Sequence, residues 1–258
     1  MKKLINVSIL AAFAIAVLSV AAFAQGSNCG ATDYQCKVDA NTKLITSNPK
    51  DAEAYYNRGI ALKQLGEYAD AIADLDTYIL SNPQKDYLAD GYSARGDCYK
   101  AQGKTAMALA DYNKSIQAYP TTTALNNRGT MYFIQGDYEK AIADFTTAIT
   151  IDPKDAEPYY NRAKAYSSQK LYAKAIADLD VYIGFNTSNI PFLADGYQNR
   201  SVAYSNINNL TKALADASKA VELDPTKARY TNRAIIYRKM GKEALAKADE
   251  ASALPMIK

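Results

Sequence analysis

Six arginines recur along this chain, and each is followed sixteen residues later by an aspartate. A guanidinium binds carboxylates and phosphates through paired hydrogen bonds, so the arginines could anchor an anionic ligand. Six copies of both members favour a structural role, because a ligand site would not need so many. We expect each arginine to pair with an aspartate on a second helix, within its repeat or across the junction. The pairs are Arg58/Asp74, Arg95/Asp111, Arg128/Asp144, Arg162/Asp178, Arg200/Asp216 and Arg233/Asp249.

Little else in the sequence has the composition of a catalytic centre. There is no histidine, which is the commonest general base and the commonest metal ligand. The glycines lie in helix-turn contexts rather than in a phosphate-binding loop, and the carboxylates are spread at the repeat spacing. We expect no enzyme activity, no metal and no cofactor.

The spacing of the arginines predicts the elements that must carry them. Successive arginines are 37, 33, 34, 38 and 33 residues apart, a period typical of stacked repeats. Counted from residues 52, 89, 122, 156, 194 and 227, the repeats have small residues at positions eight and twenty and aromatic or large apolar residues at positions four and eleven. Glycines such as Gly66 and prolines such as Pro83 end two amphipathic helices per repeat.

This pattern resembles the tetratricopeptide repeat over roughly residues 52–253. The resemblance implies an all-α, right-handed α-solenoid of about six helix-turn-helix hairpins in residues 52–258, with a concave groove that binds other proteins. Departures are local, since Lys170 and Asn208 replace the turn glycine in the fourth and fifth repeats. Residues 25–51 fit half a repeat, and we expect an N-terminal capping helix there.

A second level of repetition relates the two halves of the array. The first and fourth repeats match at 18 of 29 aligned positions, and each is followed by a longer connection and the letters LADGY. We expect these connections to extend the following helix backward. Their apolar residues either pad the core or form a lip on the binding surface. These residues are Tyr87 and Leu88 in one copy and Pro191, Phe192 and Leu193 in the other.

The resemblance also assigns candidate contacts for a partner. Positions five and six face the groove in this family, and an asparagine amide offers a donor and an acceptor to a peptide backbone. The alternative is that each asparagine only orients the neighbouring arginine. Lys63 and Lys164 could add cationic contacts. The candidates at positions five and six are Tyr56, Tyr160, Asn57, Asn127, Asn161, Asn199 and Asn232.

These features predict a non-catalytic adaptor of the bacterial envelope that holds an extended peptide or a partner helix. Alternatives are a structural protein that forms homo-oligomers by stacking through its terminal repeats, or an accessory subunit of an envelope enzyme. Charges of both signs alternate along the helices, which gives no basic face for a nucleic acid.

The first 24 residues have the composition of a secretory signal peptide. Lys2 and Lys3 precede an apolar run that ends in a small-x-small site at Ala22-Phe23-Ala24. We expect cleavage before Gln25 and export to the periplasm or medium, without a membrane attachment afterwards. An uncleaved membrane anchor is the alternative.

The three cysteines fall into two classes. Cys29 and Cys36 lie close together at the expected mature N-terminus, and in an exported chain they could form a disulfide. The alternative is that the two thiols never meet. Cys98 occupies a position that is apolar in the other repeats, and we expect an inert core thiol.

Overall fold

The computed structural model describes residues 29–185 and 190–253. The predicted signal peptide at residues 1–24 lies outside this described part of the chain. Throughout the described residues the regular elements are α-helices and no strand occurs, which confirms the all-α prediction. No helix among them is long and apolar enough to cross a membrane. The chain divides into two compact units, residues 1–119 and residues 120–258.

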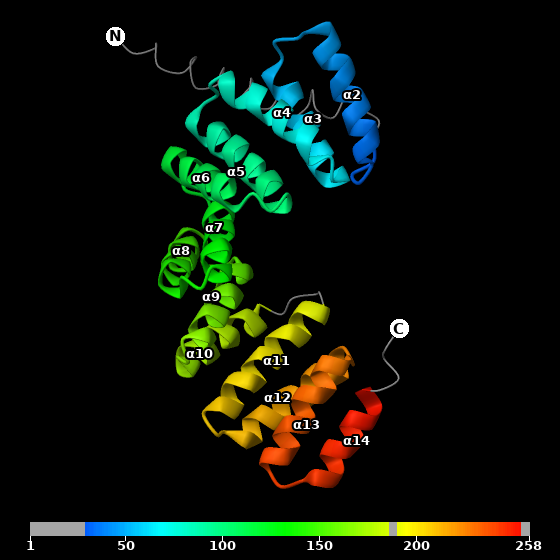
Figure 1. The fold of residues 1–258 in the computed structure, drawn as a ribbon, viewed down its shortest axis with the longest axis vertical. Helices are drawn as coiled ribbons and strands as arrows, with labels where there is room; N and C mark the ends of the chain where they lie inside the picture. Colours follow the sequence, from blue (N-terminus) through cyan, green and yellow to red (C-terminus); the bar gives the residue numbers. More distant parts are fainter. Residues whose placement is uncertain (1–28, 186–189, 254–258) are drawn as a thin grey trace, which may run out of the picture. The chain divides into compact units, whose positions relative to one another are not determined.

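Unit 1 contains two helical hairpins preceded by a single helix (Figure 1). In each hairpin the two helices pack against each other, the single helix α2 packs on the first hairpin, and α4 packs on α5. This is the capping half repeat and the first two repeats that the period predicts. The helices are α2 (Tyr34–Ser47), α3 (Ala52–Leu65), α4 (Tyr68–Leu80), α5 (Lys85–Ala101) and α6 (Thr105–Ala118).

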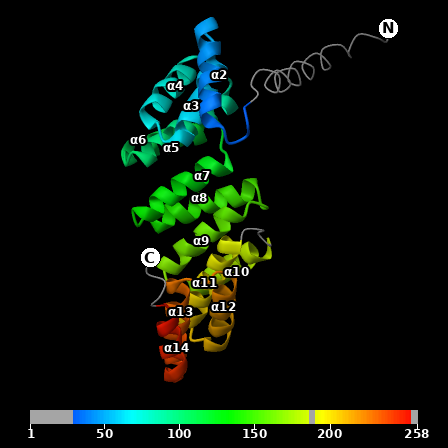
Figure 2. The same cartoon turned by 90° about the vertical axis from the view of Figure 1, so that its right-hand side faces the viewer.

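Unit 2 contains four hairpins, whose order can be followed in Figure 2. The second helix of each hairpin packs on the first helix of the next, and successive first helices also touch. We call the first and second helices of a hairpin its A and B helices. They are α7 (Thr122–Ile134), α8 (Tyr138–Ile151), α9 (Ala156–Ser168), α10 (Tyr172–Gly184), α11 (Ile190–Asn206), α12 (Leu210–Leu223), α13 (Lys227–Lys239) and α14 (Glu243–Ala253).

Small residues at position eight let the two helices of a hairpin approach closely. A Cβ added to Gly96 would lie 2.9 Å from Cε1 of Tyr112, and one added to Gly129 would lie 2.8 Å from Cε1 of Phe145. Both rings are buried, so they fill the space that the glycines leave. Interiors packed at this density do not accommodate an extra methyl group without a shift.

The turns between A and B helices require a left-handed residue. Gly66, Gly103, Gly136 and Gly241 supply it with φ between 73° and 83°. Lys170 and Asn208, which replace the glycine, keep the same conformation with φ of 61° and 59°. The turn geometry is therefore retained although the side chains disfavour it.

The longer connections extend α5 and α11 backward to 17 residues each, as predicted. In both copies a tyrosine of the preceding B helix packs on a glycine of LADGY: a Cβ on Gly91 or Gly196 would lie 2.9 Å from the ring of Tyr78 or Tyr182. The hydroxyl groups of these tyrosines donate to the carbonyl oxygens of Tyr87 and Phe192.

The expectation that Tyr87 and Phe192 pad the core is wrong. Each residue is 55% exposed, and it contributes its backbone carbonyl rather than its ring to the packing. The half-buried Leu88 and Leu193 follow them along the helices. Because side chains of a helix point in different directions at successive positions, only one residue of each pair can turn inward.

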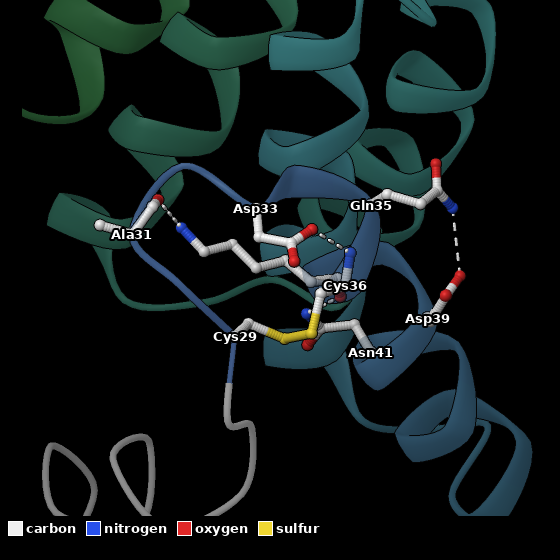
Figure 3. The surroundings of a disulfide bond; sticks show 8 residues. Cys29, Ala31, Asp33, Gln35, Cys36, Asp39 and Asn41 are labelled. Carbon is white, nitrogen blue, oxygen red and sulfur yellow. Dashed lines mark hydrogen bonds between the residues drawn. A yellow bond between two sulfur atoms is a disulfide. The ribbon is translucent and has the colours of Figure 1, made fainter.

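A disulfide between Cys29 and Cys36 joins the start of the described chain to the first turn of α2 (Figure 3). The same turn is capped by Asp33, whose carboxylate accepts from the backbone N–H of Cys36 at 3.0 Å. Lys37 donates to the carbonyl of Ala31 within the loop that the disulfide closes. Covalent and hydrogen bonds thus fix the N-terminal end of the capping helix.

Candidate functional site

All six arginine–aspartate pairs are present, each within one hairpin. The A-helix arginine donates from Nε and Nη2 to both carboxylate oxygens of the B-helix aspartate, over distances of 2.6 to 2.8 Å. These hydrogen bonds are the largest cause of a raised pKa in every one of the arginines. The arginines are therefore occupied within the fold.

The six aspartates lie in the interior of their hairpins and not on a surface, because each is only 3% to 7% exposed. The alternative of a pair that spans the junction between repeats is wrong for them, since each bonds the arginine of its own hairpin. Positions seven and twenty-three are equally far from the turn at position fifteen, so two antiparallel helices bring them to the same level. Their burial agrees with the predicted structural role. The six aspartates are Asp74, Asp111, Asp144, Asp178, Asp216 and Asp249.

Within the two units, arginines also reach across the junction to the preceding helix of the array. Arg58 Nη1 donates to Thr42 at 3.2 Å and Arg162 Nη1 to Thr146 at 3.0 Å, while Arg95 and Arg200 pair with Asp76 and Asp180. These four acceptors share position twenty-five of the repeat or half repeat. Sequence reasoning missed them, although a polar residue recurring at that position was a usable signal.

Tyrosines at positions four and eleven flank the same guanidinium groups. The Cζ atom of Arg162 lies 5.8 Å from the ring centroids of both Tyr159 and Tyr166, and Arg200 lies similarly between Tyr197 and Tyr204. Cation–π contacts of this kind add to the bidentate bond and shield it from water. The arginines and most of the tyrosines therefore belong to the packing rather than to a ligand site.

The asparagines at position six lie on the face of the A helices that adjoins the preceding A helix. Asn161 Nδ2 donates to Asn126 Oδ1 at 2.9 Å, Asn199 Nδ2 to the Tyr160 hydroxyl at 3.0 Å, and Asn232 Nδ2 to Ser201 Oγ at 3.1 Å. We call the surface of unit 2 around these groups the A-helix face. It is formed by Tyr160, Asn161, Lys164, Asn199, Val202 and Ile235.

The alternative that these asparagines only orient the neighbouring arginine is wrong, and their contact with a peptide stays a prediction. Asn161, Asn199 and Asn232 bond the preceding A helix rather than the arginine of their own repeat, and Asn161 and Asn232 each keep a second amide N–H group. Asn199 uses its nitrogen twice, since it also donates to the carbonyl of Asp195. Their amide oxygens remain as acceptors.

The other two asparagine candidates differ from these three. Asn127 is half-buried on α7, the first A helix of unit 2. Asn57 lies on α3 and makes no side-chain hydrogen bond within the described residues of unit 1.

Tyr56 and Tyr160 at position five are partly buried rather than free in a groove. Their rings lie 4.8 Å from Tyr78 and 4.9 Å from Tyr182, centroid to centroid. Burial, with a nearby Asp90, raises the pKa of Tyr56 to about 12, and burial likewise raises the pKa of Tyr160. Tyr160 accepts a hydrogen bond from Asn199, so its own proton is available for another acceptor.

The two candidate lysines differ in their surroundings. In unit 1, Lys63 Nζ lies 3.0 Å from Asp97, which also accepts from the buried Tyr112 hydroxyl at 2.7 Å. Lys63 is therefore part of a junction between hairpins. In unit 2, Lys164 Nζ lies 5.3 Å from the ring centroid of Phe133 and 5.5 Å from that of Tyr160, and has no carboxylate partner within the described residues.

The last hairpin has a charged outer surface. Arg238 bonds Glu250 at 2.6 Å and lies 3.5 Å from Glu243, at positions where the other repeats have mostly apolar residues. Buried Arg229 bonds Asp224 and Asp195, both at 2.6 Å, and so ties this hairpin to the one before. Among the described residues, no cluster of three or more acidic or cysteine side chains could hold a metal ion.

A hollow in unit 1 is lined by residues of α4, α5 and α6. The paired Arg95 and Asp111 line it, together with the exposed side chains of Leu80 and Met107. The equivalent residues of the second copy are Gly184 and Lys212. Two of the apolar residues that line the hollow are therefore not shared by the second copy.

Three models of the tetratricopeptide repeat match the chain. One described as TPR repeat covers residues 129–170, and two described as Tetratricopeptide repeat cover residues 40–73 and residues 89–122 and 194–227. Among curated proteins, human Tetratricopeptide repeat protein 6 is 29% identical over 147 residues, 57% of this chain and 28% of that protein. The Hsp70-Hsp90 organizing protein of Triticum aestivum is 30% identical over 111 residues, 43% and 19% of the two chains. The chain thus spans under a third of either relative.

Solved structures share the fold at lower identity. YrrB, titled a TPR protein with an unusual peptide-binding site, superposes with a TM-score of 0.59 at 21% identity, over 73% of this chain and 94% of that one. The C-terminal part of a TPR repeat-containing protein from Cytophaga hutchinsonii gives 0.68 at 18% identity, over 88% and 91%.

Proposed function

Because the chain is a tetratricopeptide repeat protein, we propose that it is a non-catalytic scaffold that binds an extended peptide or a partner helix along the A-helix face. The names of its relatives support this class of function, since one is named an Hsp70-Hsp90 organizing protein and another is titled a TPR protein with an unusual peptide-binding site. We extend only the general role to this chain, not their partners.

One observation carries the proposal. The A-helix face exposes aliphatic side chains beside unused amide oxygens: Val202 is 39% exposed and Ile235 is 47% exposed, and both occupy position nine on α11 and α13. Apolar residues next to backbone-compatible acceptors suit a segment of main chain that carries apolar side chains. The arginines and most tyrosines, by contrast, are already engaged inside the hairpins.

The test uses two valines of nearly equal exposure on different helices of unit 2. A photo-crosslinking amino acid replaces Val202, on the A-helix face, or Val181, which is 40% exposed on the B helix α10. Bound proteins are captured from an envelope extract and identified by mass spectrometry. We expect specific crosslinks from position 202 and not from position 181. Equal crosslinking from both, or crosslinks from position 181 alone, would contradict the proposal.

We further propose that the protein works in the bacterial envelope. Support comes from the signal-like composition of residues 1–24 and from the disulfide between Cys29 and Cys36, a bond that persists in oxidising compartments. Fractionation of cells, with N-terminal sequencing of the protein, tests both export and cleavage before Gln25. Self-assembly through the terminal repeat has less support, because Glu243 and Glu250 give that hairpin a charged surface.

A further inference from the structure

Lys164 is the cation of the A-helix face that the fold leaves without an anion among the described residues. It lies against the rings of Phe133 and Tyr160, so its ammonium group is held in place and partly withdrawn from water. The carboxylate of Asp195 is already bonded to Arg229. A partly desolvated cation without a partner attracts a carboxylate more strongly than a fully exposed one does.

A second donor lies beside this lysine. The hydroxyl of Tyr160 accepts from Asn199, and no described residue takes its proton. Burial raises the pKa of Tyr160, so the proton stays on the ring at neutral pH. Because Lys164 Nζ lies 5.5 Å from the centroid of the ring that carries this hydroxyl, one anionic group can accept from both donors.

The same position in the next two hairpins is apolar and exposed. Position nine is Lys164 on α9, Val202 on α11 and Ile235 on α13. Packed helices lie about 8–10 Å apart, and an extended chain rises about 3.3 Å per residue. A peptide that crosses these A helices therefore places about one residue in three over position nine.

We propose that the A-helix face selects an extended peptide in which an acidic residue is followed or preceded, at intervals of three, by two apolar residues. The carboxylate binds Lys164 and Tyr160, and the apolar side chains lie on Val202 and Ile235. This inference rests on the proposed function and names its ligand class. The first copy has no equivalent site, because Ile60 stands in place of Lys164 and Lys63 is bonded to Asp97.

The probes are fluorescein-labelled synthetic peptides with one Asp and two Leu at intervals of three in a Gly/Ser background, made in both orders, and matched peptides with Asn in place of Asp. Fluorescence anisotropy measures their binding to the chain. We expect one order to bind, and the Asn peptide to bind about tenfold more weakly, as for the loss of one charge-assisted contact. The preference for Asp should disappear in Lys164→Met.

Lys174→Met is the matched control. Lys174 on α10 also lies over a tyrosine ring, at 5.4 Å from the centroid of Tyr166, but it is outside the A-helix face. This variant should keep the tenfold preference. Equal binding of Asp and Asn peptides overturns the inference and leaves peptide binding itself standing. No binding of any probe also overturns it, while the crosslinking experiment still decides the proposed function.

Discussion

The guanidinium group of Arg162 and the carboxylate of Asp178 form a two-point bond between the helices of one hairpin, with both N···O distances at 2.8 Å. Thr146 of the preceding hairpin takes a third hydrogen bond from Arg162 at 3.0 Å. One side chain therefore joins three helices of unit 2. Since all six hairpins have this pair, it holds the repeat geometry rather than a ligand.

Arg162→Met should lower the free energy of unfolding by about 3–5 kcal/mol, because it leaves the buried Asp178 carboxylate without its partner. Urea unfolding followed by circular dichroism measures the change. The double variant Arg162→Met/Asp178→Leu should recover part of the loss, since the stranded charge is then absent. A single variant as stable as the parent would contradict the structural role.

Gly91→Ala should destabilise unit 1 by about 1–3 kcal/mol, the usual cost of overpacking. The added Cβ would lie 2.9 Å from two carbon atoms of the Tyr78 ring, and the ring is fixed by its hydrogen bond to Tyr87. Gly184→Ala is the control, because no described atom lies within 4 Å of its added Cβ. That change should be neutral or stabilising in thermal unfolding. The same loss from both variants would refute the packing argument.

Lys170→Gly should raise the free energy of unfolding by about 0.5–1 kcal/mol. Lys170 has a φ of 61°, a conformation that costs a residue with a Cβ about 1–2 kcal/mol, and glycine removes this cost. Part of the gain in folding free energy is lost again, because glycine also makes the unfolded chain more flexible. Asn208→Gly should gain less, since asparagine tolerates this conformation better. Chemical denaturation of both variants measures the difference, and a destabilised Lys170→Gly would count against it.

The repeat period made most of the fold predictable, because spacing alone determines which residues face the neighbouring helix. The arginine–aspartate pairs follow from it, as do the backward extensions of α5 and α11. The site was less predictable. Asn199 bonds Tyr160, and Lys63 pairs with a carboxylate while Lys164 has none among the described residues. Each of these contacts depends on which side chain the neighbouring hairpin presents. Such contacts vary from repeat to repeat while the period does not.

Alkaline pH should weaken the fold through the buried tyrosines. Burial raises the pKa of Tyr56 and of Tyr182 from 10.0 to about 12. Above pH 10 the unfolded chain loses these protons while the folded chain keeps them, so the free energy of unfolding falls as the pH rises from 10 towards 12. In Tyr56→Phe the ring remains and this loss should be smaller. Urea midpoints at pH 8, 10 and 11 measure it, and identical slopes for parent and variant would contradict the assignment.

Removing the disulfide should affect the capping helix first. In Cys29→Ser/Cys36→Ser the short loop is no longer closed, which should destabilise α2 by about 2 kcal/mol on the chain-entropy model. Fraying of α2 would expose the side of α3 against which α2 packs, and it would break the hydrogen bond from Arg58 to Thr42. Hydrogen exchange should therefore rise in α2 and α3 and stay unchanged in α11 to α14.

Cys98→Ser is the control for a lost thiol, because Cys98 lies buried in the core of unit 1 with a pKa that burial raises to about 11. It should weaken that core by the loss of packing, with hydrogen exchange rising around α5 rather than at α2. Unchanged exchange of α2 in the disulfide variant would show that packing alone holds the cap.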